Sequence, residues 1–117
     1  MNYIIWNARG TGSKSFSSLV REIKNHYQVD FMDILETRAD REKSEHRIKN
    51  MGFQEYGFTA AKGFSGGIWC LWNNGVCKIR IIESHHQYIH LCVESNRQDK
   101  WYLTVLDCGL CKSKCRE

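Results

Sequence analysis

The 117-residue chain contains no proline, although an average sequence of this length would hold about six. Proline is frequent in turns and just beyond the ends of helices, where its fixed backbone angle is an advantage. Its absence indicates a chain with few of the long, proline-bearing loops that connect elements in larger domains.

The sequence also lacks a long apolar run and a secretory leader. No stretch approaches the about 20 apolar residues of a membrane-spanning helix, and the chain enters a strand pattern at Asn2 without a basic start. We therefore expect no membrane partner and an intracellular protein, nuclear or cytoplasmic rather than secreted. The six cysteines then predict reduced thiols. Three of them, Cys70, Cys77 and Cys92, lie in apolar strand patterns as small hydrophobic residues.

A strong excess of either charge is missing too. The formal net charge is +4, which is compatible with a polyanionic partner such as DNA but does not demonstrate one. Hydrophobic residues make up 42% and charged residues 26% of the chain, values that are typical of a globular protein. The length suits one small domain, which we place at residues 1–106.

The first half of the sequence alternates between strand and helix patterns. Residues 2–7 and 30–35 are typical of buried strands. Between them, apolar residues recur at helical spacing from Phe16 to Tyr27, with Ser13 or Ser15 as the expected cap. A charged segment at 39–51 predicts a solvent-facing helix that ends near Gly52.

The second half has the period of two that is typical of strands. Trp69 and Trp72 are three residues apart and therefore should point to opposite faces of one strand. The expected strands are 53–60, 67–73, 77–83, 87–94 and 100–106, with a tight turn at 73–75. A β-α-β-α start followed by a β-meander predicts an α/β fold, a partial α/β sandwich. Residues 107–117 have no period and form an irregular tail rich in cysteine and lysine.

Two predicted strands end on polar side chains. The apolar run from Tyr3 stops at Asn7, and the run through Ile34 and Leu35 stops at Glu36. If the two strands are neighbours, an amide and a carboxylate lie side by side at their carboxyl ends, where α/β sheets place their chemistry.

Three motifs in this order resemble the endonuclease/exonuclease/phosphatase superfamily, and most of all the endonuclease domain of plant non-LTR (LINE-type) retrotransposons. They are Trp6-Asn7-x-x-Gly10, Leu35-Glu36-Thr37-Arg38 and Gly63-Phe64-Ser65-Gly66-Gly67-Ile68-Trp69. The resemblance covers residues 1 to about 105 but only the N-terminal half of the family's domain. It implies half of a four-layer α/β sandwich.

The resemblance also implies roles for individual residues. Glu36 would bind Mg²⁺, and Asn7 would orient the attacking water or the phosphate. From the residues alone, the spacing is more typical of an Asn7 that satisfies a turn and a Glu36 that is a solvated strand end. Arg9, which stands where many members carry an acidic residue, and Arg38 are candidate phosphate contacts or simple surface charges. Ser65, in a glycine-rich bend, is a candidate nucleic-acid contact in a segment that is more often structural.

Several parts of the family's site have no counterpart. None of the five histidines follows the Ser-Asp pair that precedes the family's catalytic histidine, and the family's Asp-x-Asn pair is missing. The strand ending at Leu106 continues into Asp107 and Cys108 instead of a Tyr-Gly-x-Pro turn. The tail cysteines, Cys108, Cys111 and Cys115, supply three thiolates without an obvious fourth ligand, so we expect no zinc site.

These observations predict a truncated, Mg²⁺-dependent, endonuclease-like phosphodiester hydrolase domain of retrotransposon origin, inactive on its own. One alternative is a weak, non-catalytic nucleic-acid-binding module that uses Arg9, Arg38 and the 62–67 loop. A second alternative is a non-functional fragment, because half a sandwich would expose an apolar sheet face and self-associate through it. A phosphatase-like substrate also stays open, since Asn7 and Glu36 serve the whole superfamily.

Overall fold

The computed structural model describes residues 2–63, 65–75, 77–95 and 99–107. Two helices and seven strands make up this part of the chain. In order they are β1 (Tyr3–Asn7), α1 (Phe16–Tyr27), β2 (Phe31–Leu35), α2 (Arg41–Ile48), β3 (Glu55–Thr59), β4 (Ile68–Trp72), β5 (Cys77–His85), β6 (Tyr88–Ser95) and β7 (Lys100–Leu106). The predicted elements are all present, with ends that differ by a few residues.

The first sheet has four strands in the order β1-β2-β4-β3. Strands β1 and β2 are parallel, joined through α1, and Asn7 pairs with Leu35 at their carboxyl ends. Strand β4 runs antiparallel to both β2 and β3. The two parallel strands therefore end together at one edge of the sheet.

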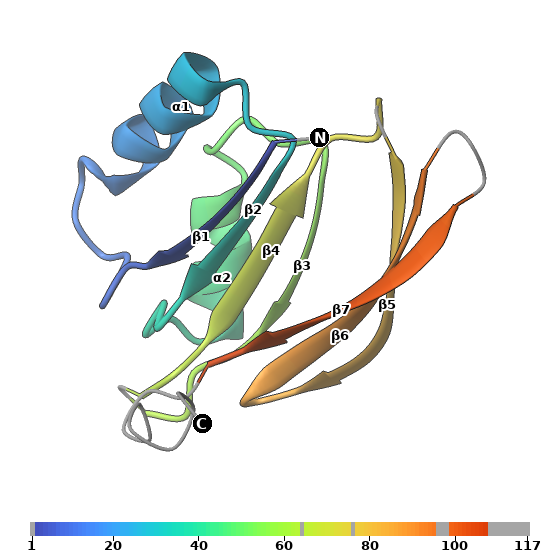
Figure 1. Cartoon of the computed structure of the whole chain (residues 1–117). Helices are drawn as coiled ribbons and strands as arrows, with labels where there is room; N and C mark the ends of the chain where they lie inside the picture. Colours follow the sequence, from blue (N-terminus) through green and yellow to red (C-terminus); the bar gives the residue numbers. More distant parts are fainter. Residues whose placement is uncertain (1, 64, 76, 96–98, 108–117) are drawn as a thin grey trace.

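The second sheet is the antiparallel meander β5-β6-β7. Figure 1 shows three layers: the two helices, the four-stranded sheet and the meander. The sequence predicts a β-meander after the β-α-β-α start, and β5-β6-β7 form it, whereas β3 and β4 pair within the first sheet. Periodicity identifies a strand but does not choose its partner.

One core lies between the first sheet and the helices. Its largest member is Trp69, which is fully buried, stands edge-on to Phe16 and donates its indole N–H to Ser44 Oγ at 2.9 Å. Helix α2 is capped by Asp40, whose carboxylate accepts the Lys43 N–H at 2.8 Å. The α1 cap differs from expectation, because the Ser15 side chain makes no capping hydrogen bond.

A second core lies between the two sheets. Its buried members are Phe31, Ile68, Cys70, Trp72, Ile89, Leu91, Val93 and Val105. Trp69 and Trp72 thus point to opposite faces of β4, as the alternation predicts. Gly57 on β3 allows this packing, because a Cβ there would collide with the Ile81 side chain of β5.

The meander covers most of the sheet face that the sequence reading leaves exposed. Residues of β2 and β4 are buried beneath β6 and β7, while Ile5 on the edge strand β1 stays 56% exposed. This face of the first sheet is therefore covered, because β5–β7 fold back over it. Self-association through an uncovered sheet face stays a prediction.

Three sequence expectations concern the cysteines, the tail and the membrane. Cys70 and Cys92 are free and buried, as expected. Residues 108–117, which hold most of the predicted tail, lie outside the described residues, whereas Asp107 is buried at the end of β7. Neither α1 nor α2 is long and apolar enough to cross a bilayer, and no other helix occurs among the described residues.

Candidate functional site

Asn7 and Glu36 lie at adjoining strand ends. Asn7 is the last residue of β1 and pairs with Leu35, so Glu36 follows one position beyond the pair. Asn7 is exposed and Glu36 is half-buried. By strand alternation, Asn7 shares its face with Tyr3 and Ile5, the face turned toward the meander. The structure therefore places an amide and a carboxylate at the same sheet edge.

The backbone at this edge has unusual angles. Arg9, Glu36 and Arg38 have φ values of 53°, 51° and 53°, and among the described residues the only other non-glycine with positive φ is Gln28 at the end of α1. Such angles cost about 1–3 kcal/mol each and persist where the surroundings enforce them. Three of these four residues thus fall in the two loops that follow β1 and β2.

The loop after β1 donates hydrogen bonds to the backbone carbonyls of the loop after β2. Ala8 N–H donates to Leu35 O at 3.0 Å, and Gly10 N–H donates to Glu36 O at 2.7 Å. The Thr11 hydroxyl donates to Thr37 O at 2.9 Å and in turn accepts from Arg47 at 3.1 Å. Consecutive carbonyls of the Glu36 loop are thereby fixed.

The glycine-rich bend before β4 accepts hydrogen bonds from the backbone amides of the loop after β2. Thr37 N–H donates to Gly67 O at 3.1 Å, and Arg38 N–H donates to Gly66 O at 2.9 Å. A Cβ at Gly67 would collide with the buried Thr37 hydroxyl, and its φ of 95° also disfavours a side chain. This bend, which the sequence offers as a ligand contact, therefore has a clear structural purpose.

The two arginines and Ser65 lie on the surface of the same rim. Arg9 and Arg38 are exposed, and the Arg38 Cδ lies 3.7 Å from the Cβ position of Gly10. Ser65 is exposed and closes a small turn through two backbone hydrogen bonds with Lys62. Both cations can reach a polyanion at this edge, but their roles, like those of Asn7, Glu36 and Ser65, stay predictions.

Asp107 is a residue of this edge that the sequence reading misses. Its Oδ2 accepts the Glu36 backbone N–H at 3.1 Å, and its own N–H donates to Gln87 O at 2.8 Å. The side chain is only 5% exposed. A signal was present, because Asp107 ends an apolar strand run as Glu36 does, yet the missing family turn led to its assignment to the tail.

The donors at this edge suit a magnesium ion that keeps most of its water. Mg²⁺ commonly binds through one or two carboxylates together with substrate phosphate, and Glu36 and Asn7 offer oxygens of the required kind. Among the described residues, no group of three His, Cys, Asp or Glu side chains converges to form a complete cage. The residues present fit a partial site, open to a phosphate.

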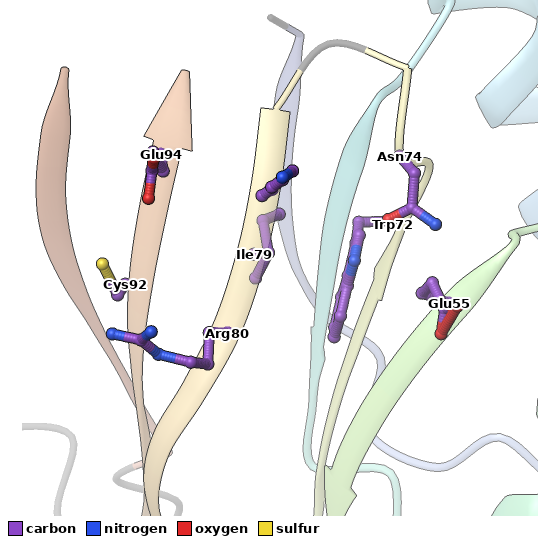
Figure 2. A pocket seen from close by; sticks show the side chains of 8 residues that line it. Glu55, Trp72, Asn74, Ile79, Arg80, Cys92 and Glu94 are labelled. Atoms are coloured by element: carbon purple, nitrogen blue, oxygen red, sulfur yellow. The ribbon is translucent and has the colours of Figure 1, made fainter. Parts of the chain in front are cut away.

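A hollow of about 390 Å³ lies at the opposite end of the sandwich (Figure 2). Glu55 and Trp72, which border it, are in register with Phe31 at the amino end of β2, far from Glu36. In Figure 2, Trp72 faces Ile79 between the sheets, so it is not available to stack on a base. Acidic, basic and apolar side chains all line the hollow, so its lining favours no one class of ligand, and we assign it none.

Comparison with known proteins identifies the fold. No family model and no curated protein matches the chain. Among solved structures, the crystal structure of the AP endonuclease LMAP from Leishmania major matches 89% of this chain with a TM-score of 0.66 and 15% sequence identity. The match covers 39% of that chain. The fold is thus similar to part of this AP endonuclease and agrees with the partial α/β sandwich expected from the sequence, and at 15% identity the likeness shows the fold alone.

Proposed function

We propose that this chain is part of a Mg²⁺-dependent endonuclease-like domain of plant LINE-type retrotransposon origin, acting on DNA inside the cell. The observation that carries the proposal is the placement of Asn7 and Glu36 at adjoining strand ends, in a fold shared with an AP endonuclease. The basic rim beside them, with Arg9 and Arg38, suits the phosphate backbone of a nucleic acid.

The proposed chemistry is metal-assisted hydrolysis of a phosphodiester. A divalent ion at Glu36 would neutralise charge on the phosphate and favour attack by water. Glu36 would hold that ion through its carboxylate, and Asn7 would orient the water or the phosphate through its amide. The backbone of residues 35–38 is held by several hydrogen bonds, which fix the point from which the Glu36 side chain starts.

The first test is metal binding at Glu36, which does not depend on turnover. We expect Mn²⁺, used as a paramagnetic substitute for Mg²⁺, to broaden the NMR amide signals of the 7–10 and 36–38 loops selectively. Glu36→Gln should lose this broadening, because the neutral amide is a weak ligand for a hard cation. Glu55→Gln, which removes an exposed acid at the far end of the sheet, is the control. Equal broadening in both variants would refute the metal site.

The second test is hydrolysis itself. We expect the 117 residues alone to leave supercoiled plasmid intact in Mg²⁺, because none of the five histidines follows the Ser-Asp pair that precedes the family's catalytic base, and general-base catalysis contributes about 10²–10⁴-fold. The assay compares the unaltered chain with Glu36→Ala at equal concentration. Nicking that disappears in Glu36→Ala would contradict the proposed inactivity and show that a base exists within this chain.

A second candidate function, DNA binding without turnover, is favoured by the exposed Arg9 and Arg38 on one rim. We expect weak binding to duplex DNA whose affinity falls as salt rises, because phosphate contacts release counterions. Replacing both arginines by glutamine should make the negative slope of log K against log salt shallower by about 2, because two phosphate contacts are lost. Arg80→Gln, on the distant meander, is the control. An unchanged slope in the double variant would place the DNA elsewhere.

A further inference from the structure

We propose that Asp107 is a positioning residue for Glu36: it holds the backbone of the candidate metal ligand in its left-handed conformation from the opposite sheet. This inference rests on the proposed function, because it assigns Asp107 a role toward the metal that Glu36 would bind. It adds a residue to which the sequence reading gave no role, at the end of the last strand that the structure describes.

Three consecutive amides explain the need for such a residue. The N–H groups of Thr37 and Arg38 donate to the backbone carbonyls of Gly67 and Gly66, whereas the N–H of Glu36 donates to a side chain, Asp107 Oδ2. With Asp107, each of the three consecutive amides, 36 to 38, has an acceptor. Without it, the half-buried Glu36 amide would have to find another acceptor or turn toward water.

Asp107 is itself anchored on the second sheet. It follows β7, its N–H donates to Gln87 O in the turn just before β6, and a Cβ added at Gly66 would lie 3.8 Å from Oδ2. The hydrogen bond to Glu36 joins residues 71 positions apart and links the loop after β2 in the first sheet to the end of β7 in the second. The position of Glu36 thus depends on the meander as well as on its own sheet.

The hydrogen bond to Asp107 is important because the Glu36 backbone has a left-handed φ angle. Glu36 has a φ of 51°, which an L-residue adopts only when neighbouring bonds enforce it. An accepting carboxylate gives a stronger hydrogen bond than a neutral carbonyl, so it is well suited to hold a strained amide. If the acceptor is lost, Glu36 can relax toward an extended conformation, and its side chain leaves the edge that it shares with Asn7.

The test compares Asp107→Ala, which removes the acceptor, with Asp107→Asn, which keeps an acceptor oxygen but not the charge. In metal-free protein, we expect the Glu36 amide proton to exchange about 10- to 100-fold faster in Asp107→Ala. Exchange in Asp107→Asn should stay close to that of the unaltered chain. Amides of β4 report whether each variant keeps its fold.

Metal binding is the second readout. We expect Asp107→Ala to weaken Mn²⁺ binding by about 10- to 100-fold, as the loss of a partner that orients a metal ligand does. Asp107→Asn should restore most of the affinity. Equal loss in both variants would overturn the positioning role in favour of a charge effect or direct ligation.

The outcomes separate this inference from the proposed function. Absence of Mn²⁺ binding in the unaltered chain would overturn the proposed function. Normal Mn²⁺ binding and normal Glu36 exchange in a folded Asp107→Ala would overturn the positioning role alone. If Asp107→Ala does not fold, Asp107→Asn decides the question. Retained Glu36 protection together with retained Mn²⁺ affinity would support the positioning role, whereas lost Mn²⁺ affinity with unchanged Glu36 exchange would overturn it, because the charge would then act on the metal and not through the hydrogen bond.

Discussion

Replacing Trp69 by alanine is expected to lower the free energy of unfolding by about 3–5 kcal/mol. Small domains are stable by about 5–15 kcal/mol in total, so this single change removes a large share of the stability. Urea denaturation followed by circular dichroism measures it, as a lower midpoint with an unchanged slope. A cooperative transition of the unaltered chain would also argue against a fragment that does not fold.

The size of the effect follows from where Trp69 lies. Its ring is fully buried between β4 and the two helices, stands 6.4 Å from the Phe16 ring, and donates to Ser44 Oγ, which bonds on to Ala39 O. Alanine would leave a cavity in the centre of the helix-side core and would remove the donor to the buried Ser44 hydroxyl.

Two variants separate these terms. Trp69→Phe keeps a ring but loses the indole N–H, so it should cost less than the alanine variant. Trp101→Ala, which removes a tryptophan that is 40% exposed, should cost about 1 kcal/mol or less. A loss at Trp101 as large as that at Trp69 would mean that the main core lies on the meander side.

The sequence predicts the first half of the fold well because its signals are local. Apolar spacing from Phe16 to Tyr27 predicts α1 at its observed bounds. The strands before and after it pair in parallel, as a β-α-β unit requires. The meeting of Asn7 and Glu36 follows from this pairing alone. Local periodicity was therefore sufficient to place the proposed site residues.

The division of the later strands between two sheets was beyond that reasoning. Strand β4 lies between β2 and β3, so it pairs with β2, a strand from which α2 and β3 separate it in the sequence. The period-two pattern does not reveal such a partner, because it is the same for a strand of either sheet. Gly57 is the sequence signal that could have helped, because a glycine inside a strand often marks close approach of another backbone or side chain. Here it admits Ile81 of β5.

The site was predicted in part for a similar reason. The resemblance pointed to Asn7 and Glu36 but gave no motif for Asp107, since its family turn is missing. The residue reaches Glu36 only when the meander folds back over the first sheet. A rule that sought every apolar run ending on an acid, applied without regard to family, would have selected Glu36 and Asp107 together.

Stability is expected to fall as pH rises from about 4 to 6, because of a carboxyl group buried between the sheets. Burial raises the pKa of Asp33 to about 6 from an ordinary 3.8, although hydrogen bonds from Tyr3 and Cys70 partly oppose the shift. Its side chain is fully buried, Tyr3 donates to Oδ2, and Oδ1 has no hydrogen-bond partner among the described residues. An apolar strand thus carries one titratable group.

The sign follows from proton binding. Between the two pKa values the folded chain keeps a proton that the unfolded chain has released, so folding is favoured at the lower pH. Above about pH 6 both states are ionised and the cost of burying the charge, about 3 kcal/mol, is complete. Urea midpoints measured at intervals from pH 4 to 7 should therefore decline over this window.

Variants assign the decline to this group. Asp33→Asn should flatten it, whereas Tyr3→Phe should steepen it and extend it to higher pH, because loss of the phenolic donor raises the pKa of Asp33 further. Asp99→Asn, an exposed acid, should leave the profile unchanged. A decline that persists in Asp33→Asn would mean that another group titrates. The three profiles together would show how much of the pH dependence of global stability belongs to Asp33.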